Sequence, residues 1–240
     1  MKLNKHVMAM NLAAVIAFGA VAGIVAPSVV GETSIVVSAA SAGDAGKSGS
    51  DAAEVLEKKT AGEKIVPDDA DKTADKNAWY ESTADGTVAY SVAKQEDAKK
   101  VVIPDTIKVN DKDVAVTAIK EGTFTGSAAL EELTLGANIK ELGTNALKDC
   151  KNLTKFDASK APLEKIGKYA LKNAKKLKSF KINGKKLKKG KIDKTFVKGC
   201  KKLKTIKVKA SKKQFNKIKG KLETAAKKTG YKKGTKVKKS

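Results

Sequence analysis

From residue 119 onward the chain repeats one apolar pattern four times, and this repeat constrains the fold more than any other feature. The four copies begin at Ile119, Leu142, Ile166 and Ile192, so successive starts are 23, 24 and 26 residues apart. One such unit is too small to enclose a core, but stacked units can share a continuous one. The other apolar columns are Phe124, Leu147, Leu171 and Phe196, then Leu130, Leu153, Leu177 and Leu203, then Leu133, Phe156, Phe180 and Ile206, and last Leu135, Ala158, Ile182 and Val208.

The second half of every copy alternates apolar and polar residues, which is typical of a short strand with one buried face. The residues before it space their apolar groups for a short helical turn. A period of about 20–29 residues with an L-x-x-L-x-L core indicates a leucine-rich repeat, so we expect an α/β solenoid whose parallel strands stack roughly 4.8 Å apart. The open face of these strands should carry Glu132, Thr134 and Gly136, then Lys155, Asp157 and Ser159, then Ser179, Lys181 and Asn183, and last Thr205, Lys207 and Lys209.

Segments on both sides of the repeats, which span residues 119–210, should cover the ends of the stack. Residues 78–118 hold strand-like runs and should form an N-terminal β cap and entry rung, with a hairpin turn at Asn110-Asp111. Residues 211–240 predict a Lys-rich C-terminal cap helix and tail, with a last short strand around Val237. The alternative for this helix is an interfacial membrane helix. Its apolar face should consist of Phe215, Ile218, Leu222, Ala225 and Ala226.

The N-terminal segment is typical of an exported protein. Lys2 and Lys5 precede an uncharged apolar stretch, and small residues including Ala40-Ser41-Ala42 follow it, so residues 1–42 predict a secretory signal peptide. The apolar stretch is also long enough to span a bilayer, and an uncleaved anchor is therefore the alternative. Residues 43–77 are poor in large apolar groups and predict a disordered linker. We expect a protein that is secreted or displayed on the cell surface and meets the membrane only through its signal segment.

The charge of the chain is unusual in kind and in distribution. It has 50 Lys and no Arg against 26 acidic residues, a net charge of +24, and residues 151–240 alone hold 34 Lys against 4 acidic residues. The absence of Arg excludes a bidentate guanidinium clamp on carboxylate or phosphate. The expected open face also lacks aromatic residues on which bases could stack, so no specific nucleic acid is expected. A diffuse attraction to anionic polymers is the functional interpretation, and lysines that only keep a small solenoid soluble are the alternative.

The residues that could carry chemistry are few. The single histidine is His6. Cys150 and Cys200 lie in the same column two rungs apart, roughly 10 Å, which exceeds the Cα separation of about 7 Å that a disulfide tolerates, so we expect two buried thiols in the core. An acidic run from Asp68 to Asp71 lacks the ligand spacing of a calcium loop, and a solvated linker fits it better. The sequence therefore assigns no catalytic, cofactor or metal residue.

The repeat also resembles a known family. The resemblance lies in the A-F-x-x-C-x-x-L-x-x-I-x-I core, present as NALKDCKNLTKFDA and KTFVKGCKKLKTIKV, and in the preceding run VVIPDTIKVNDKDVAVTAIKEGTF. Over about residues 79–210 the chain is similar to the BspA-like (Treponema pallidum-type) leucine-rich repeat proteins. This resemblance implies a secreted or surface-displayed bacterial protein that binds host matrix, other cells or wall polymers.

These features together predict a monomeric binding module and not an enzyme. The main hypothesis is non-covalent retention on anionic cell-wall or surface polymers through the Lys-rich half, with Lys155, Lys181, Lys207 and Lys209 as the candidate contacts. The alternative is an adhesin that recognises a protein ligand through the sheet face. A hydrolase is the least favoured hypothesis, because it needs two facing carboxylates and the acids of the repeats are scattered.

Overall fold

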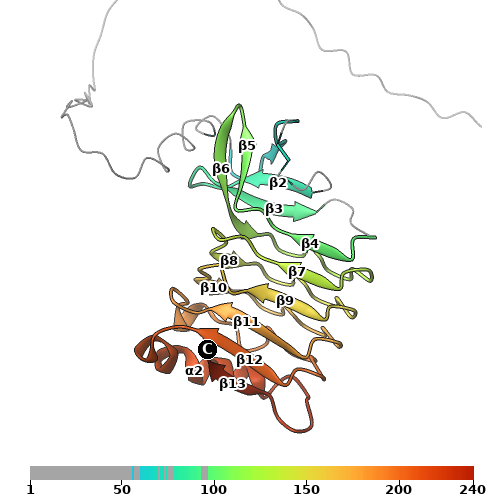
Figure 1. Cartoon of the computed structure of the whole chain (residues 1–240), viewed down its shortest axis with the longest axis vertical. Helices are drawn as coiled ribbons and strands as arrows, with labels where there is room; N and C mark the ends of the chain where they lie inside the picture. The colour runs from blue at the N-terminus through green and yellow to red at the C-terminus, as the bar shows by residue number, and fades with distance from the viewer. Residues whose placement is uncertain (1–55, 57–59, 70, 73, 75–77, 93–96) are drawn as a thin grey trace, which may run out of the picture. The chain divides into compact units, whose positions relative to one another are not determined.

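The computed structural model describes residues 56, 60–69, 71, 72, 74, 78–92 and 97–240 of the chain, all of which lie in the unit that spans residues 45–240 (Figure 1). The signal peptide predicted for residues 1–42 lies outside the described residues. Among the residues that are described, no helix is long and apolar enough to cross a membrane.

The alternation within the repeats produces a six-stranded parallel sheet, which confirms the expected stacking. The register pairs Glu132 with Lys155 and Lys181 with Lys207, so polar side chains of successive strands fall opposite one another. Apolar side chains do the same on the buried face, as Phe156 and Phe180 illustrate. In spatial order the strands are β4 (Lys100–Val102), β7 (Glu132–Thr134), β9 (Lys155–Ala158), β11 (Ser179–Asn183), β12 (Thr205–Lys209) and β13 (Lys236–Lys239).

The strands of the second sheet vary from two to eight residues in length. In spatial order these are β1 (Lys64–Ile65), β2 (Ala78–Ser82), β3 (Val88–Val92), β6 (Lys112–Ile119), β8 (Glu141–Leu142) and β10 (Lys165–Ile166). β6 also pairs antiparallel with β5 (Thr106–Val109). Beyond β10 the second sheet continues only as an isolated bridge between Ile166 and Ile192, and a short 3-10 helix, η1 (Lys189–Lys191), precedes Ile192.

The repeated apolar columns form the core. Leu130, Leu153, Leu177 and Leu203 are each at most 1% exposed, and the Phe156 and Phe180 rings lie edge to face with their centroids 5.7 Å apart. We number the repeats as rungs 1 to 4, which begin at Ile119, Leu142, Ile166 and Ile192. Backbone hydrogen bonds between successive rungs show which residues share a column.

One predicted column is wrong at its last member. Leu147 N donates to Ala170 O, and Leu171 N donates to Phe196 O. Phe196 therefore corresponds to Ala170, and Val197 takes the place expected for Phe196. Both Phe196 and Val197 are fully buried, so a bulky ring occupies a position where rungs 2 and 3 have alanine.

A column of left-handed residues turns the chain once in every rung. Gly126, Asp149, Asn173 and Gly199 have φ values of 78°, 63°, 60° and 79°. The backbone amide of each donates to a carbonyl of the next rung, and the last of these bonds runs from Gly199 N to Lys228 O. Because Lys228 follows the C-terminal helix, the chain after that helix enters the stack as a partial fifth rung and then forms β13.

The hairpin between β5 and β6 has the expected turn. Asn110 and Asp111 have φ values of 51° and 62°, which is the geometry of a type I′ turn. The carboxylate of Asp68 accepts from both of their backbone amides, at 3.0 Å and 2.8 Å.

The disordered linker predicted for residues 43–77 is wrong for part of its second half. β1 pairs antiparallel with β2, and Ile65 is 4% exposed. Asp71 is also 4% exposed, and its carboxylate accepts from Lys108 N at 2.7 Å and from Ala74 N at 3.2 Å. Asp68 and Asp71 were expected to be solvated in a linker, but their carboxylates accept hydrogen bonds from backbone amides.

The C-terminal helix, α2 (Lys212–Ala226), begins where the capping box predicts, with the Ser211 side chain accepting from Gln214 N. Gln214 also donates through Nε2 to Gly184 O and Leu187 O, which fastens the helix to the third rung. Its buried residues are those of the predicted apolar face, Phe215, Ile218, Leu222, Ala225 and Ala226.

Candidate functional site

The outer face of the six-stranded sheet carries the charged residues that the sequence singled out. Pairing of β4, β7, β9, β11, β12 and β13 places six side chains in one outer row along the solenoid, and this row changes from apolar to acidic to basic. In order the row consists of Val102, Thr134, Asp157, Lys181, Lys207 and Lys238.

On the first rungs of this face, charges are neutralised within the sheet. Lys155 lies opposite Glu132, and its Nζ is 3.4 Å from Glu132 Oε2. Burial pushes the pKa of Asp157 upward, but hydrogen bonds from Ser159 and the charges of Lys181 and Lys155 outweigh it, so the pKa lies below its ordinary value. Asp157 is thus held as an anion, with Lys181 opposite it and Lys155 on its own strand.

On the last rungs the lysines lie beside one another. Lys181, Lys207 and Lys238, which we call the lysine ladder, are direct neighbours on β11, β12 and β13, and all three are exposed. Neighbouring strands are about 4.8 Å apart. Among the described residues none of Lys207, Lys209, Lys236 and Lys238 has a carboxylate within ion-pair distance. Like charges directly opposite each other destabilise a sheet, so this arrangement costs stability unless an anion covers it.

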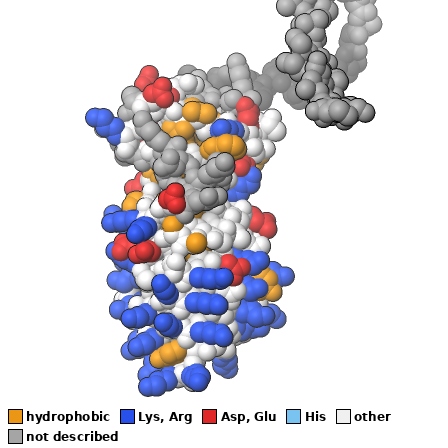
Figure 2. Space-filling view, turned by 90° about the vertical axis from the view of Figure 1, so that its right-hand side faces the viewer, with side chains coloured by type: hydrophobic (Ala, Val, Ile, Leu, Met, Phe, Trp, Pro, Cys, Tyr) orange, Lys and Arg blue, Asp and Glu red, His pale blue; other side chains and the backbone are white. Residues whose placement is uncertain are grey.

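The turns between the strands show the same gradient. One outer column reads Glu131, Thr154, Lys178 and Lys204, and the backbone bonds from Thr154 N to Glu131 O and from Lys204 N to Lys178 O fix its register. In the space-filling view, lysines gather over the lower turns, whereas acidic side chains lie mainly higher on the molecule (Figure 2). The positive charge is therefore concentrated toward the C-terminal end of the stack.

The structure separates the four predicted contact residues into two kinds. Lys155 is ion-paired, and Lys181 has Asp157 on one side and Lys207 on the other. Lys207 and Lys209 are exposed and lie on β12, where Lys209 pairs with Asn183.

Two further lysines of the face were missed, Lys236 and Lys238 on β13. The signal that could have found them is the alternation of lysine with Val237, whose partner in the ladder is Ile206.

Cys150 and Cys200 lie in the core as free, fully buried thiols. Each Sγ donates to a carbonyl of the preceding rung at 3.0 Å, Cys150 to Phe124 O and Cys200 to Leu171 O. Burial raises the pKa of each thiol to about 12. A thiol with so high a pKa is a poor nucleophile and a poor metal ligand near neutral pH.

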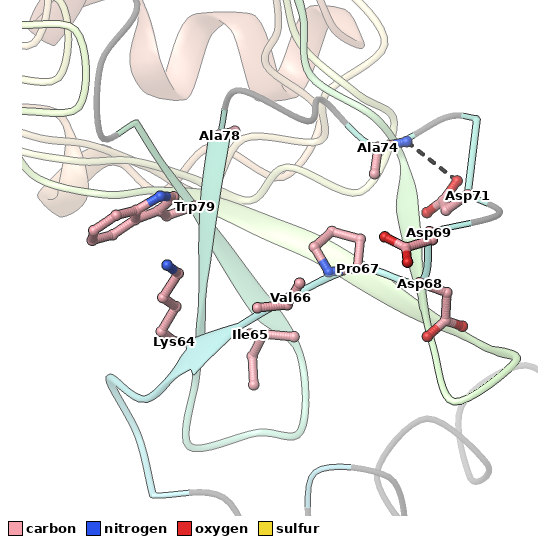
Figure 3. A pocket seen from close by; sticks show the side chains of 10 residues that line it. All are labelled: Lys64, Ile65, Val66, Pro67, Asp68, Asp69, Asp71, Ala74, Ala78 and Trp79. Carbon is pink, nitrogen blue, oxygen red and sulfur yellow. Dashed lines mark hydrogen bonds between the residues drawn. The ribbon is translucent and has the colours of Figure 1, made fainter.

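A hollow of about 230 Å³ lies beside β1 and β2 (Figure 3). Trp79 is 48% exposed, but the Nζ of Lys64 lies 3.7 Å from the centroid of the indole ring and covers one of its faces. Asp68 and Asp71 also line the hollow, and both carboxylates accept from backbone amides. Within the described part of the chain, no cluster of His, Cys, Asp and Glu could hold a metal ion.

The repeated columns and the parallel sheet define a leucine-rich repeat protein. The chain belongs to the BspA-type leucine rich repeat family, whose model matches residues 93–219 as six copies, two more than the sequence columns indicated. A search of curated proteins finds no match.

Solved structures of bacterial leucine-rich repeat proteins are similar to this chain at low identity. A leucine rich cell surface protein from Faecalibacterium prausnitzii is 18% identical with a TM-score of 0.45, over 62% of this chain and 42% of its own. The leucine rich repeat protein of T. pallidum is 15% identical with a TM-score of 0.41, over 56% of this chain and 70% of its own. A protein from Bacteroides ovatus is 17% identical with a TM-score of 0.37, over 57% and 47%. The chain thus spans less than half of the F. prausnitzii protein.

Proposed function

We propose that this protein is a cell-surface interaction module that binds linear anionic polymers through the lysine ladder. The observation that supports this most strongly is the register of Lys181, Lys207 and Lys238 on three adjacent parallel strands. Stacked like charges lower the stability of the free protein, and a polyanion laid along the solenoid axis would remove that cost. Binding and not catalysis is the activity that such a surface supports.

The ammonium group of lysine determines the kind of binding that this surface can support. An ammonium group is a compact, strongly hydrated charge without the planar fork of arginine. The lysine ladder would therefore attract a polymer through many weak contacts and release condensed counterions as it binds. Affinity should be high at low salt and should fall steeply as salt rises, as for a protein held reversibly on an anionic cell-wall polymer.

Export to the cell surface is the second part of the proposal. It is supported by the sequence of residues 1–42, with its basic start, uncharged apolar stretch and small-residue end. Outside the cell, wall polymers rich in phosphate would be the available polyanions.

Binding of long-chain polyphosphate to the purified chain tests the proposal. The ladder variant Lys181→Gln/Lys207→Gln/Lys238→Gln should bind roughly tenfold or more weakly at about 50 mM salt, because each lost charge contact contributes a few tenths to one kcal/mol. A matched variant, Lys176→Gln/Lys202→Gln/Lys213→Gln, removes the same charge from exposed sites away from the sheet and should bind within about threefold of the wild type. Equal weakening of both variants would show that net charge alone attracts the polymer, and the proposal would be wrong.

A further inference from the structure

The stack has one irregular rung, and a basic hollow lies there, beside the last strand of the second sheet. Backbone hydrogen bonds join the corresponding turns of successive rungs. Gly122 N of rung 1 donates to Thr144 O of rung 2 at 3.0 Å, and Asn145 N of rung 2 donates to Lys168 O of rung 3 at 2.8 Å. Among the described residues the next bond of this series, from Tyr169 N to Lys194 O, is not made.

The cause of the break is local to the fourth rung. Asp193 stands where rungs 2 and 3 have Gly143 and Gly167, and its carboxylate accepts from the backbone amide of Thr195 at 2.7 Å and from the Thr195 hydroxyl. Thr195 does not adopt the left-handed conformation of Asn145, which has a φ of 55°. The fourth rung therefore turns differently at this point, and in the described part of the chain one bond to the third rung is missing between the bonds from Asp193 N to Ile166 O and from Leu171 N to Phe196 O.

An open hollow of about 400 Å³ lies at this break. Its lining comes from β10 and the turn after it, from the segment around η1, and from α2, and it includes no residue of the six-stranded sheet. Its volume falls in the range of about 300–1,000 Å³ that is typical of small-molecule sites. The basic residues that line it are Lys165, Lys168, Lys191, Lys194 and Lys221.

The charge of this hollow is not balanced internally. Lys165 is paired with Glu141 at 2.5 Å. The only carboxylate of the lining is that of Asp193, which its own turn uses. Lys168, Lys191, Lys194 and Lys221 have no carboxylate within ion-pair distance among the described residues.

Lys221 shows that α2 contributes to the hollow. It is half-buried, whereas the other lysines of α2 are exposed, so the helix turns this one side chain toward the solenoid. It follows that lysines 27, 30 and 53 residues before Lys221 in the sequence line the same concavity with it.

The geometry points to a second anion site, in which Lys168, Lys191, Lys194 and Lys221 bind a compact, multiply charged anion of the phosphate class. Lysine binds phosphate as a point charge, and several ammonium groups around one hollow suit an anion with several charges close together. A free phosphorylated molecule and the end of a phosphate polymer share this chemistry. The site does not depend on the lysine ladder, because the two share no residue.

Calorimetric titration of the full chain with inorganic tripolyphosphate at about 50 mM salt tests this site. We expect one equivalent to bind, and the variant Lys168→Gln/Lys194→Gln/Lys221→Gln to bind roughly tenfold or more weakly. The matched variant Lys176→Gln/Lys202→Gln/Lys213→Gln should remain within about threefold of the wild type. Equal weakening in both variants, or no saturable binding to the wild type, would overturn the assignment.

A single substitution guards against an effect of misfolding. Thr144 lines the hollow, and Glu121 holds the corresponding position of rung 1, so a glutamate is compatible with this turn. Thr144→Glu should weaken tripolyphosphate binding several-fold, and Thr144→Gln should leave it within about twofold. Unchanged binding in Thr144→Glu would contradict the site.

The ladder variant separates this inference from the proposed function. It should retain tripolyphosphate binding while losing affinity for long-chain polyphosphate. The hollow variant, Lys168→Gln/Lys194→Gln/Lys221→Gln, should lose tripolyphosphate binding and retain affinity for long-chain polyphosphate. Retained long-chain binding in the hollow variant would identify a free compact anion as its ligand class. Loss of tripolyphosphate binding in the ladder variant would mean that the hollow is not a separate site.

Discussion

Lys181 of β11 lies directly opposite Lys207 of β12 in a parallel ladder, and Lys238 of β13 flanks Lys207 on its other side. In the same sheet, Glu132 lies opposite Lys155 and pairs with it. Opposite charges therefore pair at one end of the sheet, whereas like charges lie beside one another at the other end. The free protein should be less stable than its core alone would allow.

Replacing the central lysine of the ladder should stabilise the protein while weakening its binding. Lys207→Glu places a carboxylate between two ammonium groups, and we expect the free energy of unfolding to rise by about 0.5 kcal/mol. Affinity for long-chain polyphosphate should fall in the same variant. Urea unfolding and binding measured on one preparation check both effects.

The mirror substitution at the other end of the sheet is the control. Glu132→Lys places a third lysine between Lys100 and Lys155, so it should lower the free energy of unfolding by a similar amount. A destabilised Lys207→Glu variant would contradict the account of the ladder as a strained arrangement.

Two glycine substitutions should act in opposite directions. Gly199 has a φ of 79°, and a Cβ there would clash with Asn173 Oδ1, so Gly199→Ala should cost about 1–3 kcal/mol. Gly220 lies within α2 with open space around its Cα, so Gly220→Ala should stabilise the protein by up to about 1 kcal/mol. Urea unfolding of both variants checks the signs, and a neutral Gly199→Ala would be inconsistent with the tight left-handed column.

The buried thiols should make stability fall at high pH. The thiol pKa is about 12 in the folded chain and close to its ordinary value in the unfolded chain, so between these values the folded chain holds more protons. Their contribution is complete below the ordinary pKa and is lost as pH rises toward about 12. Between about pH 8 and pH 10 the wild type should lose roughly 1.5–2 kcal/mol per thiol more than Cys150→Ala/Cys200→Ala does.

Alkylation offers a second readout for the thiols. At about pH 9, iodoacetamide should modify Cys150 and Cys200 rapidly in urea and very slowly in buffer. Rapid modification in buffer would mean that the column opens readily.

The acidic segment before β2 should be part of the fold. Asp71→Ala removes the acceptor of the Lys108 amide at a buried position, and we expect a loss of about 1–3 kcal/mol. Asp71→Asn keeps one acceptor oxygen and should lose less. If Asp71→Ala unfolded at the same urea concentration as the wild type, the segment would contribute nothing to stability.

The sheet was predictable from the sequence because its side chains alternate with a period of two. Once one apolar column is assigned, the alternation determines which residues face outward. The outward pairs of Thr134 with Asp157 and of Asn183 with Lys209 follow from that assignment. The same logic applied to α2, where five apolar residues at helical spacing are the buried ones.

The remaining features depend on partners distant in sequence. Asp68 and Asp71 look like solvated acids until the β5–β6 hairpin brings its amides to them from about 40 residues away. Phe196 was assigned to the wrong column because its ring was matched without counting the offset: Val197 lies five residues after Ile192, as Leu171 lies five residues after Ile166. β13 joins the sheet only after α2, so Lys238 could not be aligned by the repeat period. Short strands and irregular rungs contain too few alternating residues to be predicted from the local sequence.

The most direct test of the central claim is a lysine footprint of the full chain with long-chain polyphosphate. Limited acetylation followed by mass spectrometry would compare the modification rate of every lysine with and without the polymer at about 50 mM salt. Lys181, Lys207 and Lys238 should be protected most, while Lys108 and Lys120, which pair with acids near the N-terminal end, should stay accessible. Equal protection of lysines over the whole surface, or protection that omits the ladder, would contradict that claim.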